Sequence, residues 1–186
     1  MEPLDESTKA SMIGVTWREG CPVPLDDLRA VEVTYVGFDG NDHRGTLVVN
    51  ASATDEIITV FGRLYEAGFP IRKMIPIEAY GGDDDASTKD DNTSAFNCRT
   101  VSGSSTISQH AYGLAIDINP LENPYVRRDG TVLDPVAEQF LDRSLGAPGM
   151  IVRGDVVVKA FSSAGWGWGG NFSSTKDYQH FSANGR

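Results

Sequence analysis

The sequence has 186 residues, 40% of them hydrophobic, with a formal net charge of -10 and a pI of about 4.6. This length suits one domain with a sizeable core. The acidic balance and the lack of a basic stripe argue against a nucleic-acid partner, and no run reaches the roughly 18 to 20 apolar residues of a membrane span.

The first 14 residues are polar and lack any hydrophobic periodicity, so we expect a loosely packed tail or linker before a single domain at 15–186. This segment has no apolar core of a signal peptide. Two interpretations stay open, a cytoplasmic protein or a secreted one whose leader or anchor has been removed.

A β-hairpin is predicted next. Val31, Val33 and Tyr35 alternate with polar residues, and the apolar run GTLVVNA follows a turn-rich segment at 37–45. His43 lies in that segment without a partner at ligand spacing, so we expect an exposed loop histidine.

An amphipathic helix is predicted from Ser52 to Gly68. Its apolar face is formed by Ile57, Ile58, Phe61, Leu64 and Tyr65. Residues 71–80, IRKMIPIEAY, then alternate like a strand, in which Pro76 indicates an edge or a bulge.

An acidic, turn-rich segment follows at 81–97. Its aspartates are Asp83, Asp84, Asp85, Asp90 and Asp91. They lack the order of an EF-hand and its final glutamate, which favours a solvated surface loop over a calcium site. Cys21 and Cys98 either form one disulfide or stay as two buried thiols.

The run GLAIDIN at 113–119 is apolar apart from Asp117, which predicts a buried central strand. Pro135 at a first helical position indicates a short helix through about Arg143. A second helix is expected at 155–164, with Val157, Val158, Phe161 and Ala164 facing inward.

His110 and Asp117 stand seven positions apart across a turn, and form a candidate metal site. Taken alone, the pair is equally well explained by a surface histidine and by an aspartate paired with Arg99 or Arg127. A buried unpaired carboxylate is costly, which favours a bound cation at Asp117.

A second cluster favours the metal site over these alternatives, because Asp177 and His180 stand three positions apart near the C-terminus. Two histidines and one aspartate make a three-ligand zinc site with an open fourth position, and a nearby carboxylate can move the proton of an activated water. The alternative, Asp177 as a cap or surface charge and His180 as a core residue, is weaker once all four residues are counted together.

The segments SQHAYGLAIDINP and WGWGGNFSSTKDYQHF resemble the two signature regions of the M15 family of zinc metallopeptidases, the D-alanyl-D-alanine carboxypeptidase and L-alanyl-D-glutamate endopeptidase group. The resemblance implies a compact α+β fold, with a small, mainly antiparallel sheet flanked by helices and one Zn²⁺ at the sheet. It also implies that His110, Asp117 and His180 are the zinc ligands and that Asp177 is the general base. The implied substrate is a peptidoglycan stem peptide.

The resemblance places Arg99 where it would stabilise an oxyanion or hold a substrate carboxylate, although a surface salt bridge to the acidic segment is the alternative. Ser108 matches a family serine that holds the substrate or the shape of the site. Tyr112 and Trp168 are candidate substrate contacts, and Trp166 and Trp168 are equally well explained by core packing.

We expect a secreted or cell-wall-associated monomer. The sequence leaves open whether the enzyme is a carboxypeptidase or an endopeptidase. The alternative from another class is a non-catalytic zinc-bearing binding module on the same scaffold.

Overall fold

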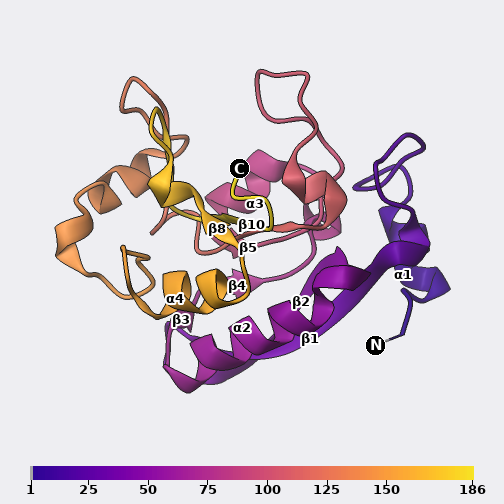
Figure 1. The fold of residues 1–186 in the computed structure, drawn as a ribbon, viewed down its shortest axis with the longest axis horizontal. Helices are drawn as coiled ribbons and strands as arrows, with labels where there is room; N and C mark the ends of the chain where they lie inside the picture. Colours follow the sequence, from indigo (N-terminus) through magenta and orange to yellow (C-terminus); the bar gives the residue numbers. More distant parts are fainter. Residues whose placement is uncertain (1) are drawn as a thin grey trace.

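The structure, a computed structural model, describes residues 2–186 and has an α+β architecture, as the sequence predicted. The long hairpin of β1 (Leu28–Gly37) and β2 (Asp42–Asn50) is its largest sheet element (Figure 1). The strands are antiparallel, with Leu28 opposite Asn50, and β3 (Pro70–Ile71) adds to β1 in parallel. The predicted hairpin is confirmed.

The turn of the hairpin is shorter than predicted, and His43 lies in β2 rather than in a loop. Its ring stacks on Tyr35 of the neighbouring strand at a centroid distance of 5.5 Å, and its Nε2 lies 2.9 Å from Asp39 Oδ1. This cross-strand aromatic contact extends the ladder into the region that the polar sequence suggested as a turn.

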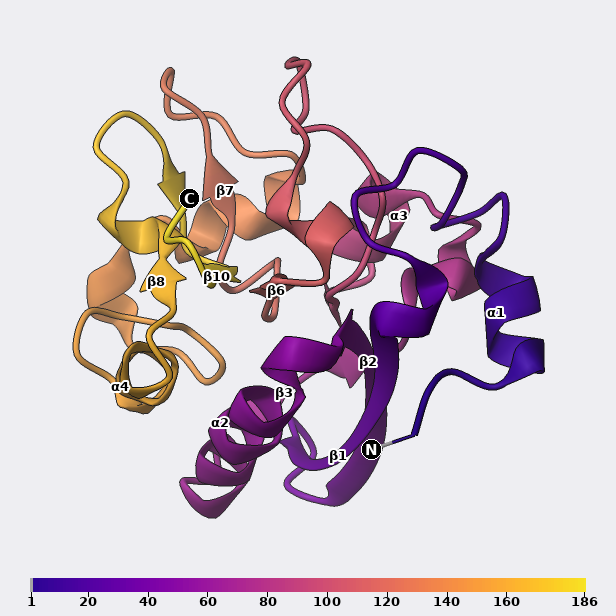
Figure 2. The ribbon, with the colours of Figure 1, turned by 45° about the vertical axis from the view of Figure 1, so that its right-hand side comes forward.

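Helix α2 (Thr54–Glu66) follows the short 3₁₀ turn η2 (Ala51–Ala53) and packs on the hairpin, with α4 (Val156–Ser163) beside it (Figures 1 and 2). Its buried face consists of Thr54, Ile57, Val60, Phe61 and Leu64. Of the predicted inward residues, Ile58 and Tyr65 are exposed, because they fall at the edge of the apolar stripe. In α4, Val157 and Phe161 are buried as predicted, Val158 and Ala164 are partly buried against the core, and Ala160 is buried as well.

The predicted strand at 71–80 is wrong as a single element. The chain instead forms β3, then β4 (Lys73–Met74), which pairs in parallel with β5 (Asn92–Thr93), and then the 3₁₀ helix η3 (Ile77–Tyr80). Pro76 lies at the N-cap of η3, and its fixed φ and missing N–H suit the end of a strand.

The acidic segment forms a helix, α3 (Asp84–Lys89), so the prediction of a loop is wrong there. The Asp83 side chain accepts a hydrogen bond from the Ala86 amide as an N-cap. Of the five aspartates, Asp91 alone is buried, and the solvated surface predicted for that residue is also wrong.

A second sheet carries the candidate site. Its strands are β6 (Ala115–Asp117), β10 (His180–Ser182) and β8 (Gly167–Trp168), in the order β6-β10-β8 with antiparallel pairing. The predicted central strand at 113–119 is therefore a short, buried edge strand, and β10 takes the centre. Next to this sheet, β7 (Tyr125–Val126) pairs with β9 (Lys176–Asp177).

Several connections are 3₁₀ helices. The helix predicted from Pro135 to about Arg143 is divided into η5 (Pro135–Phe140) and η6 (Arg143–Leu145). The other three are η1 (Leu25–Asp27), η4 (Gln109–Tyr112) and η7 (Gly169–Asn171).

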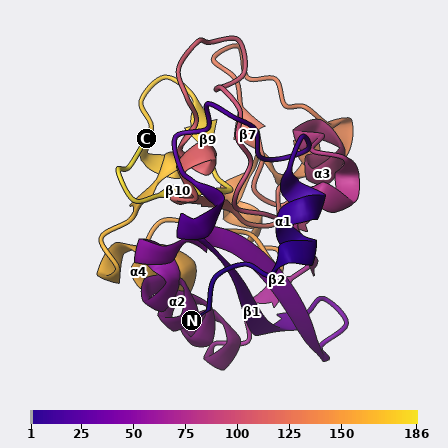
Figure 3. The same cartoon turned by 90° about the vertical axis from the view of Figure 1, so that its right-hand side faces the viewer.

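The N-terminal segment is packed rather than loose. Helix α1 (Glu6–Met12) begins at an Asp5 N-cap and stands at the opposite end of the molecule from α4 (Figures 1 and 3). Leu4 and Met12 are buried in a small second core with Phe96 and Cys98. The sequence shows no periodic pattern between these two apolar residues, so it did not predict their burial.

Cys21 and Cys98 form a disulfide, which resolves the alternative that the sequence left open. The bond joins the N-terminal segment to the chain just before Arg99. Disulfides persist in oxidising compartments, so this bond is consistent with an extracellular protein. Among residues 2–186, no helix is both long and apolar enough to cross a membrane.

Candidate metal centre

His110, Asp117 and His180 meet at one point, although 70 residues separate the two histidines. His110 lies on η4, Asp117 ends β6, and His180 begins β10 directly opposite Asp117 in the antiparallel register. One nitrogen of each imidazole and a carboxylate oxygen lie within 4.8 Å of one another, and all three residues are buried.

The atoms that converge are His110 Nε2, His180 Nδ1 and the two Asp117 oxygens. The Asp117 Oδ1 atom lies 2.9 Å from His180 Nδ1, and Oδ2 lies 3.2 Å from His110 Nε2. The two nitrogens are 3.3 Å apart. Two imidazole nitrogens and a carboxylate oxygen are ligands that zinc and related divalent metals prefer.

The outer nitrogen of each ring faces a main-chain oxygen. His110 Nδ1 lies against the main-chain oxygen of Ala95, and His180 Nε2 lies 3.2 Å from the main-chain oxygen of Arg186. An N–H donated to these oxygens leaves a lone pair on the inner nitrogen of each ring, and it fixes the ring orientation. The residues present therefore fit a metal ion.

The turn that presents His110 depends on two neighbours. The Ser108 hydroxyl accepts a hydrogen bond from the His110 amide at 3.3 Å as the N-cap of η4. Gly113 ends η4 with a φ of +67°, and a Cβ there would lie 2.5 Å from the amide nitrogen of Asn50. Glycine is required both by the backbone conformation and by this close approach to β2.

The surroundings shift the pKa values of Asp117 and His180. Burial opposes the charged form of Asp117, but His110 and His180 hold the pKa of that carboxyl below its usual range. Burial likewise favours a neutral His180, yet Asp117 raises the pKa of His180 to about 9. The two shifts thus favour an ionised Asp117 carboxylate beside a protonated His180.

Asp177 lies near the cluster on β9, opposite Tyr125 of β7. Its Oδ1 atom is buried and has no hydrogen-bond partner among the described residues. Burial raises the pKa of Asp177 to about 7, against the positive influence of His180. A Cβ on Gly169 would lie 2.5 Å from the Asp177 carbonyl oxygen, so glycine allows β9 to pack this closely.

Arg99 is held by the acidic helix. One of its terminal nitrogens, Nη2, lies 2.7 Å from Asp84 Oδ2, while its Nε is buried without a hydrogen-bond partner. The salt bridge to the acidic segment, which was the alternative role for Arg99, is therefore present. The guanidinium charge also lowers the pKa of Asp177, so Arg99 acts on the site as well.

The remaining predicted site residues lie in different surroundings. Ser108 is buried in the cap just described, and Tyr112 is half-buried, with its carbonyl accepting a hydrogen bond from Asn50. Trp168 is packed in the core, where its indole N–H donates to the Tyr178 carbonyl at 2.8 Å. For Trp168, core packing is the alternative that the structure supports.

Sequence reasoning missed the main-chain oxygens of Ala95 and Arg186, because a main-chain oxygen leaves no residue-type signal. It also missed Phe172, whose ring lies 6.4 Å from that of His180 between centroids. The aromatic type of Phe172 and its place between the two signature residues Trp168 and His180 were the available signal.

Residues 102–183 match the family model described as D-alanyl-D-alanine carboxypeptidase. This match supports membership of the M15 peptidase family. The matched region contains the three converging residues and Asp177, and it begins three positions after Arg99. The comparisons with curated proteins and with solved structures gave no match. The match also supports a peptidase of the peptidoglycan-related group, which suggests a peptide substrate.

Proposed function

We propose that this protein is a zinc-dependent hydrolase of peptidoglycan stem peptides, related to the M15 peptidases that residues 102–183 match. The observation that carries the proposal is the convergence of His110 Nε2, His180 Nδ1 and Asp117 at one buried point. These three residues would hold one Zn²⁺. When bound, the ion supplies Lewis-acid polarisation of the scissile carbonyl and a water with a pKa lowered to around 7.

Asp177 is proposed as the general base and acid. Its unpartnered Oδ1 accepts a proton from the attacking water and delivers it to the leaving amine nitrogen as the C–N bond breaks. A pKa near 7 suits both steps, since the same group must first accept and then release the proton. A non-catalytic binding module has no use for such a carboxylate.

Arg99 is proposed to stabilise the oxyanion or to bind a substrate carboxylate. To do so, its guanidinium exchanges the Asp84 carboxylate for the substrate group, which the partly exposed ion pair permits. Ser108 keeps the shape of the η4 turn, and Tyr112 contacts the substrate from the same turn. Trp168 is not retained as a substrate contact, because it is packed in the core.

The description of the matched family favours a carboxypeptidase acting on D-alanyl-D-alanine termini, and an endopeptidase cutting L-alanyl-D-glutamate bonds is the second specificity of the group. We propose a secreted or cell-wall-associated monomer, supported by the Cys21–Cys98 disulfide for the first point.

The test uses the zinc-loaded full chain with synthetic stem peptides. One set ends in D-Ala-D-Ala and the other contains the L-Ala-D-Glu bond, and the products are identified by mass spectrometry. We expect cleavage of one set, which a chelator abolishes and which added zinc restores. The His110→Ala variant is the control for a contaminating peptidase. If neither set is cleaved in a chelator-sensitive way, the proposed function is wrong.

A further inference from the structure

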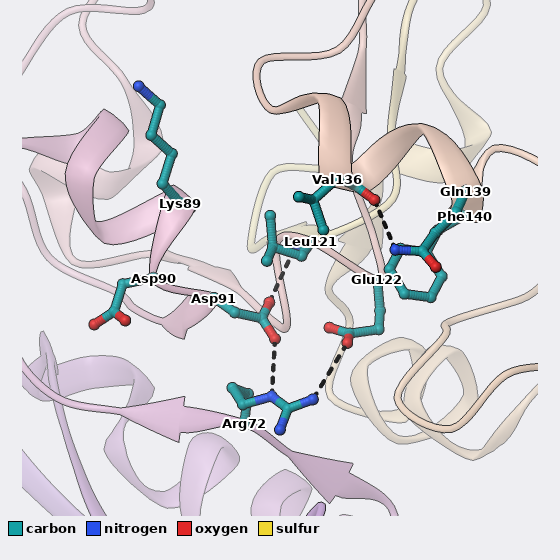
Figure 4. Close-up of a pocket in the computed structure, with 9 residues that line it drawn as sticks. All are labelled: Arg72, Lys89, Asp90, Asp91, Leu121, Glu122, Val136, Gln139 and Phe140. Carbon is teal, nitrogen blue, oxygen red and sulfur yellow. Dashed lines mark hydrogen bonds and ion pairs between the residues drawn. The ribbon is translucent and has the colours of Figure 1, made fainter.

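A separate cavity of about 380 Å³ lies between the end of α3, the chain after β6, and η5 (Figure 4). None of the residues that line it belongs to the candidate metal centre. Its walls include Leu121, Val136 and Phe140, and Asp91 and Glu122 contribute the carboxylates.

Asp91 and Glu122 are held in place by the fold. They are only 3% and 5% exposed. The Asp91 Oδ1 atom accepts a hydrogen bond from the Leu121 amide at 2.9 Å. Asp91 also has a φ of 52°, a conformation that few residues other than glycine adopt. The Asp91 carboxylate is therefore positioned by its backbone and is not a mobile surface group.

Both residues have an oxygen without a hydrogen-bond partner. Asp91 Oδ2 and Glu122 Oε2 are buried and accept no hydrogen bond within the described chain, and Figure 4 shows the two carboxyl groups pointing toward each other. Buried carboxylate oxygens that accept no hydrogen bond are unfavourable, and natural structures contain few of them.

Arg72 forms long ion pairs with both carboxylates but donates no hydrogen bond to either. Its Nε lies 3.6 Å from Asp91 Oδ2, and its Nη2 lies 3.9 Å from Glu122 Oε1, both beyond hydrogen-bond length. The guanidinium instead lies over the ring of Phe38, at 4.0 Å from the centroid, and the side chain is 49% exposed. With both carboxylates ionised, one net negative charge remains.

We propose that Asp91 and Glu122 bind a hard divalent cation, Ca²⁺ or Mg²⁺, at this cavity. Carboxylate oxygens are the ligands that these ions prefer, and a site with two protein carboxylates leaves the other positions to water. The cavity has room for such waters. The ion would join the segment after α3 to the segment that follows Asp117, so its binding stabilises the fold rather than the chemistry.

A proton shared between the two carboxyl groups competes with the cation. Burial, together with Glu122, raises the pKa of Asp91 to about 8, so one proton is retained at neutral pH when no cation is bound. Of the other charged groups at the cavity, Asp90 is paired with Lys73, Lys89 lies at the wall, and Arg72 lies above the pair. Cation binding is therefore tighter at pH 8.5 than at pH 6.

The test measures the melting temperature of the zinc-loaded full chain during titration with CaCl₂ or MgCl₂, at constant ionic strength. At about ten times the dissociation constant we expect a rise of about 3 to 6 °C with one of the two ions, larger at pH 8.5 than at pH 6. Zinc content is measured before and after, so that displacement of zinc is detected.

Three variants test the site itself. Glu122→Gln should remove the rise in melting temperature, whereas the matched control Asp85→Asn, at an exposed aspartate of α3, should keep it. Arg72→Gln removes the competing positive charge and should lower the dissociation constant for the cation by about 3-fold or more. Calorimetric titration of Arg72→Gln keeps the test valid if Glu122→Gln does not fold.

Three results would contradict the proposed cation site. The proposal is overturned if neither ion raises the melting temperature, or if Glu122→Gln retains the rise. A fall in cation affinity in Arg72→Gln would also contradict it. None of these readouts depends on peptidase activity, so the outcome is independent of the proposed catalytic function.

Discussion

Asp117 and Asp91 are both buried aspartates, at 7% and 3% exposure, yet the structure shifts their pKa values in opposite directions. Asp117 faces two imidazoles, which favour its carboxylate form. Asp91 faces Glu122, and the arginine above it is too distant to form a hydrogen bond. Burial alone thus does not determine the charge of an aspartate, because the partner groups determine whether desolvation is offset.

Asp177 stands between these two cases. It is desolvated like Asp91, but it lies close enough to the histidines and Arg99 for their charges to act on it. The three aspartates therefore differ in the number of positive groups near each carboxylate, and the differences can be tested by removing one charge at a time.

The largest effect is expected for Asp117→Asn. This variant removes a proposed ligand at the centre of the cluster, so metal affinity should fall by more than roughly 100-fold, the upper range for changes outside the ligand set. The loss of metal affinity is measured as zinc content after dialysis. Asp91→Asn, which leaves the catalytic site unchanged, is the matched control. Zinc retention by Asp117→Asn would contradict the assignment.

Asp177→Asn should act on the chemical step alone. Loss of a general base costs about 10²- to 10⁴-fold, so kcat should fall by that amount while zinc content is unchanged. Steady-state kinetics on the cleaved stem peptide provide the measurement, and Asp177→Glu should restore part of the rate. An Asp177→Asn enzyme with full activity would remove this residue from the mechanism.

A smaller effect is expected at Arg99. Replacing a charge-assisted contact costs about 1.5 to 3 kcal/mol, which predicts a 10- to 100-fold lower kcat/KM for Arg99→Gln. The control is Asp84→Asn, which removes the ion-pair partner without removing the guanidinium. That variant should keep kcat/KM within a few-fold, and an equal loss in both variants would assign the pair to stability.

The smallest effect concerns pH and Asp91. Its folded-state pKa of about 8 exceeds the ordinary unfolded value, so the contribution of Asp91 to folding stability is largest below about pH 4 and is lost as pH rises through about 8. In cation-free buffer, Asp91→Asn should flatten this decline by about 1 kcal/mol or more. Thermal unfolding at pH 5 and pH 8.5 measures the difference, and parallel curves for the two proteins would refute it.

Much of the site was predictable because its signal is chemical. Three side chains that can bind a metal, His110, Asp117 and His180, were identified by residue type and spacing, and the β6–β10 pairing brings them together. The hairpin and α2 were predictable because their apolar periodicity extends over many residues. The roles of His110, Asp117 and His180 as metal ligands stay predictions.

The rest was set by tertiary contacts that leave little local pattern. Strands of two or three residues, such as β4 and β6, are too short for alternation to identify. Asp91 belonged to an acidic run that appeared solvated, and only the positive φ and the approach of Leu121 place it inside. Trp168 was ambiguous because a tryptophan flanked by glycines suits a core and a groove equally.

The disulfide divides the chain into two parts with different constraints. It closes a loop from Cys21 to Cys98 that contains the hairpin, α2 and α3, whereas His110, Asp117, Asp177 and His180 all follow the loop. In the unfolded chain, oxidation therefore restricts the scaffold and leaves the metal-binding residues unrestrained. In the chain-entropy model, closing a loop of this length raises the free energy of the unfolded state by about 4 kcal/mol. Breaking the disulfide would therefore lower the stability of the hairpin and helices that support the site, without removing any metal ligand.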